Sequence, residues 1–137
     1  MRRVLPLAAV LGLLAAAPAA HAGAVQLRIT ADTGPGTAKR HASLTCDSEG
    51  PRATGFLHRR DAAKLCTRAY ALESFLGAAP RTGGACPMVY GGPDRAVVRG
   101  AVRGTAVHRR FSRADGCQLA WWNRARRLLP RAAGVTR

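Results

Sequence analysis

The sequence predicts a small α+β domain in which antiparallel strands and helices are held together by two disulfides. Several segments alternate apolar and polar residues between turn formers, which is typical of half-buried strands. One longer stretch instead repeats apolar residues at helical spacing. All four cysteines lie after residue 22, and an even count of cysteines in an exported chain indicates two disulfides.

Residues 1–22 have the features of a secretory signal peptide. Two arginines follow the first methionine, residues 4–17 are apolar, and residues 20–22 form a small-x-small cleavage site. The apolar run is too short to span a membrane. We therefore expect residues 23–137 to form one domain that is secreted and extracellular.

The chain is strongly basic, with 22 Lys and Arg residues against 7 acidic residues and a formal net charge of +15. This balance is typical of proteins that contact a polyanion or an anionic surface. The first interpretation, however, is that the arginines, which outnumber the lysines 20 to 2, only provide a soluble surface, and a polyanion contact is the second. The basic residues are densest over 99–137, so under the second interpretation a weak polyanion contact would come from this arginine-rich C-terminal part.

The first part of the domain is predicted to be a β-hairpin followed by a loop. Residues 25–30 and 41–46 each alternate apolar and polar residues, and a turn with Gly-Pro-Gly separates them. Residues 47–55 are rich in turn formers and are expected to be a loop. The inward-facing residues of the first strand are predicted to be Val25, Leu27 and Ile29.

A single helix is predicted over about residues 60–76, because apolar residues recur there at helical spacing. Asp61 lies near its start, where the helix dipole favours an acid, and Gly77 can end it. Cys66 lies about one turn inside, so a bridge to Cys46 would clamp the helix to the second strand. The stripe predicted to face the core is Leu65, Ala69, Leu72, Phe75 and Leu76.

Residues 96–111 are predicted to be rich in strands. Two Arg-Gly pairs, at 99–100 and 103–104, separate runs that contain β-branched residues, and they indicate a meander or a kinked hairpin. Val107 and Phe111 should face the core.

The C-terminal part can form a basic amphipathic helix with two tryptophans over residues 118–129, which Pro130 ends. We expect its apolar stripe to pack on the core. Binding of this element to an anionic lipid or polymer is the second interpretation.

Glycines and prolines enclose the segment 86–90, Cys-Pro-Met-Val-Tyr, on both sides, which favours a loop. Pro87 has a fixed φ and no N–H, and it drives Cys86 toward an extended backbone. If Cys86 is disulfide-bonded, the segment is an anchored, extended peptide with the shape of a bound protease substrate. The alternative is that Met88 and Val89 end a buried strand.

Two disulfides among four cysteines allow three pairings. We favour Cys46–Cys66 together with Cys86–Cys117, each adding about 3 kcal/mol of stability. Zinc is the competing interpretation, but the sequence has no C-x-x-C pair and its histidines are scattered, so neither a metal nor a cofactor is expected. Without Gly-x-Ser-x-Gly or His-Glu-x-x-His, and with few carboxylates, the chain is expected to have no catalytic residue and not to be an enzyme.

Several of these motifs together resemble the Streptomyces-type subtilisin inhibitors. They are Thr45-Cys46, the segment 86–90 and Phe111-Ser112 leading to Cys117. The cysteine spacing also agrees, with 19 residues between Cys66 and Cys86 and 30 from there to Cys117. The resemblance spans about residues 25–117.

The resemblance implies a sheet of about five antiparallel strands covered on one face by two helices, and the two disulfides already favoured. It implies a secreted homodimer, formed through the sheet, that inhibits subtilisin-like serine proteases in a substrate-like manner. The reactive bond would be Met88–Val89, with Met88 in the primary pocket of the protease. The other protease-contacting residues would be Ala85, Cys86, Pro87 and Tyr90.

Two of the departures from the family pattern concern the loop after Tyr90 and the C-terminal tail. Residues 91–93 are Gly-Gly-Pro where the family has Asp-Pro, and we expect the extra glycine to loosen this side of the loop. Residues 118–137 form a divergent basic tail in place of a short apolar strand. The second interpretation is therefore a basic binding module on the same scaffold, which contacts an anionic polymer through residues 99–131 without inhibiting proteases.

Overall fold

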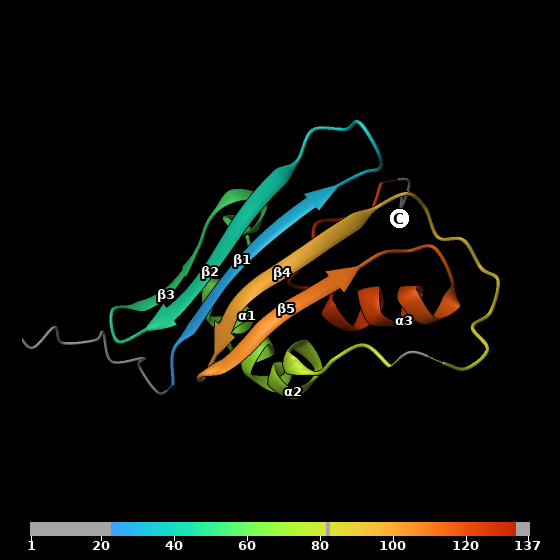
Figure 1. Ribbon diagram of the computed structural model, residues 1–137. Coiled ribbons are helices and arrows are strands. Elements are labelled where there is room, and N and C mark those ends of the chain that lie inside the picture. Colours follow the sequence, from blue (N-terminus) through green and yellow to red (C-terminus); the bar gives the residue numbers. More distant parts are fainter. Residues whose placement is uncertain (1–22, 82, 134–137) are drawn as a thin grey trace, which may run out of the picture.

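One antiparallel sheet with the strand order β3-β2-β1-β4-β5 organises the molecule (Figure 1). The computed structural model describes residues 23–81 and 83–133, so the expected signal peptide lies outside the described residues. The strands are β1 (Val25–Asp32), β2 (Arg40–Asp47), β3 (Gly50–Ala53), β4 (Arg95–Val102) and β5 (Thr105–Phe111).

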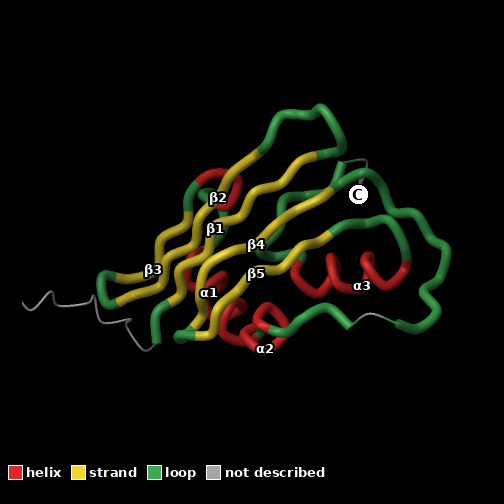
Figure 2. Tube along the Cα trace, viewed as in Figure 1, coloured by secondary structure: helices red, strands yellow, loops and turns green. Residues whose placement is uncertain are grey.

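The helices cover one face of this sheet, which confirms the predicted α+β class (Figures 1 and 2). They are α1 (Ala62–Ala71), α2 (Glu73–Gly77) and α3 (Gly116–Ala125), and a short 3₁₀ turn, η1 (Gly55–Leu57), precedes them. The described residues thus contain three α-helices where two were expected, because the predicted helix 60–76 is divided.

The core lies between the helices and the inner face of the sheet. Alternate residues of each long strand point into it, as the period of two requires. Full burial of a Leu, Ile or Val side chain contributes about 1.5–3 kcal/mol. The most completely buried strand residues are Val25, Leu27, Ile29, Leu44, Val98 and Val102.

The predicted β1–β2 hairpin is confirmed, with Leu27 opposite Leu44. The loop expected over residues 47–55 is wrong, because Gly50–Ala53 pairs with β2 as β3. Pro51 lies opposite Cys46 in this short strand. A proline, which has no N–H to donate, is tolerated in a strand at the edge of a sheet. The turn residues that suggested a loop therefore belong to an edge strand.

The predicted helix 60–76 is interrupted at Leu72, whose backbone has φ −101° and ψ 3°. The Leu72 N–H is shared between the carbonyls of Arg68 and Ala69, both at 3.1 Å, so α1 tightens and ends there. Asp61 starts α1 as predicted, since its Oδ1 accepts a hydrogen bond from the Lys64 N–H at 3.1 Å. The predicted stripe still faces the core, with Phe75 half-buried.

β4 and β5 form a single kinked hairpin rather than a meander. Gly100 lies inside β4 with φ +136°, and a Cβ there would approach the Gln26 carbonyl oxygen to 1.8 Å. The actual turn is at Arg103 and Gly104, with φ values of 47° and 81°, which fits a type I′ hairpin. The first Arg-Gly pair therefore marks a close approach to β1 and not a turn.

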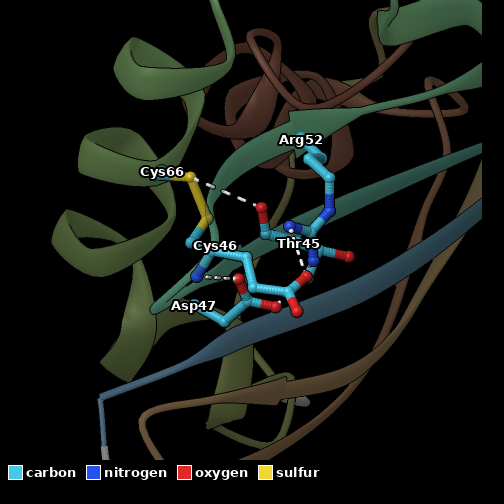
Figure 3. Close-up of polar contacts among 6 residues, drawn as sticks. Thr45, Cys46, Asp47, Arg52 and Cys66 are labelled. Atoms are coloured by element: carbon cyan, nitrogen blue, oxygen red, sulfur yellow. Dashed lines mark hydrogen bonds and ion pairs between the residues drawn. A yellow bond between two sulfur atoms is a disulfide. The ribbon is translucent and has the colours of Figure 1, made fainter.

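Both predicted disulfide pairings are confirmed. Cys46–Cys66, with an S–S distance of 2.01 Å, joins β2 to α1 (Figure 3). Next to it, the ion pair of Asp47 and Arg52, 2.7 Å apart, joins β2 to β3 (Figure 3). Cys86–Cys117, with an S–S distance of 2.04 Å, joins the α2–β4 connection to α3.

The C-terminal helix packs on the core, as predicted, but it ends at Ala125 and not at the predicted stop, Pro130. α3 begins at Gly116, where the Asp115 side chain accepts from the Gln118 N–H at 2.9 Å. Trp122 is buried, and so are Leu128, Leu129 and Pro130 after the helix ends. Within the described residues, no helix combines the length and the hydropathy needed to cross a membrane.

Candidate functional site

The connection between α2 and β4, residues 78–94, is the candidate site and is called the Met88 loop below. Its described residues form neither helix nor strand. It extends from one end of the molecule and passes the N-terminal end of α3 (Figure 1).

The Met88 loop exposes three consecutive hydrophobic side chains. Met88 is 97% exposed, Val89 53% and Tyr90 68%, and within the described residues these are the exposed large hydrophobic side chains. Ala85 and Pro87 beside them are also exposed. The alternative that Met88 and Val89 end a buried strand is therefore wrong. A monomeric protein rarely exposes contiguous apolar side chains unless they take part in recognition.

The upstream side of the loop is fixed to the start of α3. Besides the Cys86–Cys117 bond, the Pro87 carbonyl accepts a hydrogen bond from the Gly116 N–H at 2.8 Å. The Pro87 ring lies so close to Gly116 that a Cβ on this glycine would be 2.9 Å from the Pro87 Cβ. Pro87 is therefore held by a covalent bond next to it, a hydrogen bond and a ring contact.

Met88 occupies the apex of a tight turn. The Val89 N–H donates to the Pro87 carbonyl at 2.8 Å, which is the hydrogen bond of a γ-turn centred on Met88. The expectation of an extended backbone thus fails at this residue. Met88 points outward at this turn. The Met88–Val89 peptide bond is held in a fixed orientation, because the chain is tethered before it at Cys86 and Pro87 and after it at Gly91.

The downstream side is also fixed, which differs from the expected loosening at the glycines. The Gly91 N–H donates to the Arg113 carbonyl at 2.8 Å. A Cβ on Gly91 would lie 2.2 Å from Leu119 Cδ2, so a larger residue here would require the Leu119 side chain or the loop to shift. At Gly91 the absence of a side chain permits close contact between the loop backbone and Leu119 of α3.

A buried ion pair lies where the loop joins β4. Asp94 Oδ2 is 2.8 Å from Arg113 Nη1, and their side chains are 3% and 11% exposed. The second carboxylate oxygen of Asp94 accepts from the Ala133 N–H at 3.0 Å. Asp94 thus connects the loop with the segment after β5 and with the C-terminal segment. This pair was not predicted from the sequence.

Arg109 on β5 fixes the other end of the loop and was also missed. It is 3% exposed, and its Nη1 donates to the Ala78 carbonyl at 2.8 Å and the Phe75 carbonyl at 3.3 Å. Its guanidinium lies 4.5 Å from the Phe75 ring centroid and 5.0 Å from that of Trp121. Burial, followed by the charge of Arg124, lowers the pKa of Arg109. The sequence did offer one sign that Arg109 is buried: this residue shares the strand alternation of Val107 and Phe111, which were predicted to face the core.

Cys86, Cys117 and Asp115 place two sulfurs and a carboxylate close enough for a metal ion. The two sulfurs are bonded to each other, so neither offers a thiolate. The Asp115 carboxylate already caps α3. This group is therefore a structural anchor of the loop.

No family model matches this chain, and no curated protein matches it. Among solved structures, it is similar to Streptomyces caespitosus sermetstatin in its crystal structure in complex with Bacillus licheniformis subtilisin. The identity is 21%, the match covers 72% of this chain and 90% of the other, and the TM-score is 0.46. At this identity and TM-score, the function has to be argued from the residues of this chain.

Proposed function

We propose that this protein is a secreted inhibitor of subtilisin-like serine proteases, which binds through the Met88 loop with Met88–Val89 as the reactive bond. The observation that carries the proposal is the outward position of Met88, 97% exposed, on a loop that is tethered on both sides. A peptide that is ordered before binding loses less conformational entropy in the complex than a flexible one.

The nature of residue 88 supports this class of protease. Methionine is unbranched and polarisable, so it fits a roomy apolar primary pocket. It offers no positive charge to a pocket that selects Lys or Arg. Ala85, Pro87 and Tyr90 flank the reactive bond and would contact the protease around its primary pocket. Cys86 would act there mainly as the anchor.

The tethers also explain how a cut would be reversed. The nucleophilic oxygen of the protease bonds to the Met88 carbonyl carbon, and the Val89 nitrogen leaves with a proton. The new Met88 end remains connected through Cys86 to Cys117, and the new Val89 end remains near Arg113 through the Gly91 hydrogen bond. Because both ends stay close, attack of the Val89 amine on the acyl-enzyme competes with hydrolysis.

The proposal is tested by titrating subtilisin with the wild-type protein and with two variants of residue 88. Wild type is expected to inhibit with one site per chain. Met88→Leu keeps an apolar residue of similar volume and should inhibit nearly as well. Met88→Asp places a charge in the apolar pocket and should weaken binding by at least about 2 kcal/mol, or roughly 30-fold. Full inhibition by Met88→Asp, or none by wild type, would refute the proposal.

The homodimer expected from the family resemblance stays a prediction. The sheet face opposite the helices carries Arg28 and Arg99 directly opposite each other, with Arg110 nearby on β5. Two such faces in contact would bring like charges together, so any dimer should strengthen as salt screens them. Sedimentation at low and high ionic strength tests this expectation.

A further inference from the structure

A basic groove lies between α1 on one side and the end of α3 with the chain that follows it on the other. Its volume is about 1120 Å³. One acidic residue, Asp61, lines it. Its basic lining residues, apart from Arg113, which is paired with Asp94, are Arg60, Lys64, Arg68, Arg126, Arg127 and Arg131.

The two walls of the groove are connected by arginines that donate to backbone carbonyls. Arg60 Nη1 donates to the Arg127 carbonyl at 2.6 Å, and Arg68 Nη2 donates to the Arg124 carbonyl at 2.8 Å. Arg68 Nε is buried and has no hydrogen-bond partner within the described residues. These guanidiniums are therefore held in place before any ligand arrives.

The acidic residues of the protein leave most of this charge uncompensated. Of the seven, six form ion pairs, and the seventh, Asp115, caps α3. Only Asp61, paired with Lys64 at 3.6 Å, lies in the groove. No described carboxylate pairs with the groove arginines other than Arg113. Burial, followed by the charges of Arg131 and Arg40, lowers the pKa of Arg60, as expected where positive charges crowd together.

We propose that this groove binds a linear polymer of closely spaced phosphate or sulfate groups. The cations are spread over two elements and a volume much larger than one oxyanion, which favours a chain over a single ion. Such a polymer supplies repeated acceptors for guanidinium groups, and its binding releases counterions.

The tryptophans argue against a single-stranded nucleic acid as the occupant. Trp122 lines the groove but is only 3% exposed, and Trp121 is half-buried under Arg109. Neither offers an open ring on which bases stack, and stacking supplies much of such binding. The groove also differs from the site expected from the sequence, residues 99–131, because α1 and the residue just before its cap contribute Arg60, Lys64 and Arg68.

The test compares two triple variants with the same change in charge. The groove variant is Lys64→Glu, Arg127→Glu and Arg131→Glu. In the part of the chain that the structure describes, these side chains make no hydrogen bond or ion pair other than the exposed Lys64–Asp61 contact. The control is Arg28→Glu, Arg99→Glu and Arg110→Glu on the outer sheet face. Circular dichroism and thermal melting of both variants verify the fold.

Binding to inorganic polyphosphate, to heparin and to an oligodeoxynucleotide is measured against salt concentration. The groove variant should bind the phosphate or sulfate polymer at least about tenfold more weakly, with a salt slope smaller by about three, one for each cation. The control should change less. The polyphosphate and heparin arms identify whether the preferred group is phosphate or sulfate.

Three outcomes overturn the proposal. They are equal losses in both triple variants, which means that only net charge matters, binding of the oligonucleotide alone, and no binding of any polymer by wild type. Inhibition of subtilisin by the groove variant is a separate readout, so this result and the result for the Met88 loop are independent.

Discussion

The same covalent link has different surroundings at the two disulfides. Cys46 and Cys66 are 5% and 7% exposed, and their bond joins β2 to α1 inside the core. Cys86–Cys117 lies at the end of the molecule, and the chain next to it continues into the most exposed apolar side chains. The first bond holds two packed elements together, and the second holds a loop that has little packing of its own.

Chain entropy alone does not distinguish the two bonds. Their sequence separations are 20 and 31 residues, and either loop corresponds to about 3–4 kcal/mol of stabilisation. The two bonds differ in the part of the chain that each keeps ordered: Cys46–Cys66 holds packed elements, and Cys86–Cys117 holds the exposed Met88 loop. Mutations at the two bonds should therefore separate the stability of the domain from the presentation of the loop.

The largest effect is expected from removing the loop disulfide. Cys86→Ala with Cys117→Ala should release the segment that carries Met88, so that binding to subtilisin weakens at least about 100-fold and the protein is cut as a substrate. Cys46→Ala with Cys66→Ala should cost about 3 kcal/mol of stability and leave inhibition near the wild-type level where the variant is folded. Inhibition titrations and denaturant unfolding measure the two quantities.

The cleavage products also distinguish the two disulfides. After partial cleavage at Met88–Val89, wild type should run as one species on a non-reducing gel and as two fragments after reduction, because residues 86 and 117 hold them together. The variant without the loop disulfide should release fragments in denaturant alone. Equal inhibition by both double variants would contradict the distinction between the two bonds.

The next effect concerns the noncovalent anchor at Asp94. Asp94→Ala leaves Arg113 buried without its partner and removes the acceptor for the Ala133 N–H. Breaking a buried ion pair costs about 3–5 kcal/mol, and the lower end applies because Arg113 keeps some contact with water. We expect lower stability together with weaker inhibition. Arg95→Ala, which removes an exposed pair with Asp32 at 3.0 Å, is the matched control and should change either quantity by about 1 kcal/mol at most.

The difference between the regions also decides what the sequence can predict. The strands β1 and β2 and the helix α1 follow local periods, so alternation and helical spacing find them. The anchors of the loop have no such period, since Asp94 and Arg113 are 19 residues apart and Arg109 is 31 residues from Ala78. Only folding brings these groups together. β3 was missed because Gly50 and Pro51 signal a turn, and only the neighbouring strand shows that they form an edge.

A smaller effect is expected at the contact of Pro87 with Gly116. Gly116→Ala should be neutral or slightly favourable for α3, because alanine has a helix propensity about 1 kcal/mol better than glycine. Its Cβ, however, would lie 2.9 Å from Pro87 and displace the root of the loop. We expect unchanged or higher thermal stability with inhibition weakened about tenfold, or 1.4 kcal/mol. Ala120→Gly, on the exposed side of α3, is the control and should lower stability without affecting inhibition.

The smallest effect is expected at Glu73, which lies on α2 and contacts the β4–β5 turn at the opposite end of β5 from α3. Its carboxylate accepts from the Thr105 hydroxyl and from Arg103 Nε, each at 2.7 Å, and these hydrogen bonds, in that order, lower the pKa of Glu73. A lowered pKa in the folded state means that the contribution to stability is present above the unfolded pKa and is lost as the pH falls through the folded value.

Glu73→Gln should therefore be slightly less stable than wild type near neutral pH and equally stable in acid, where both side chains are neutral. Thermal melting across the acidic range measures the difference between the two proteins. Inhibition at neutral pH should not change, because the partners of the Glu73 side chain are Thr105 and Arg103, which lie outside the Met88 loop. A change in inhibition without a change in stability would show that the body and the loop are coupled, against the separation drawn from the two disulfides.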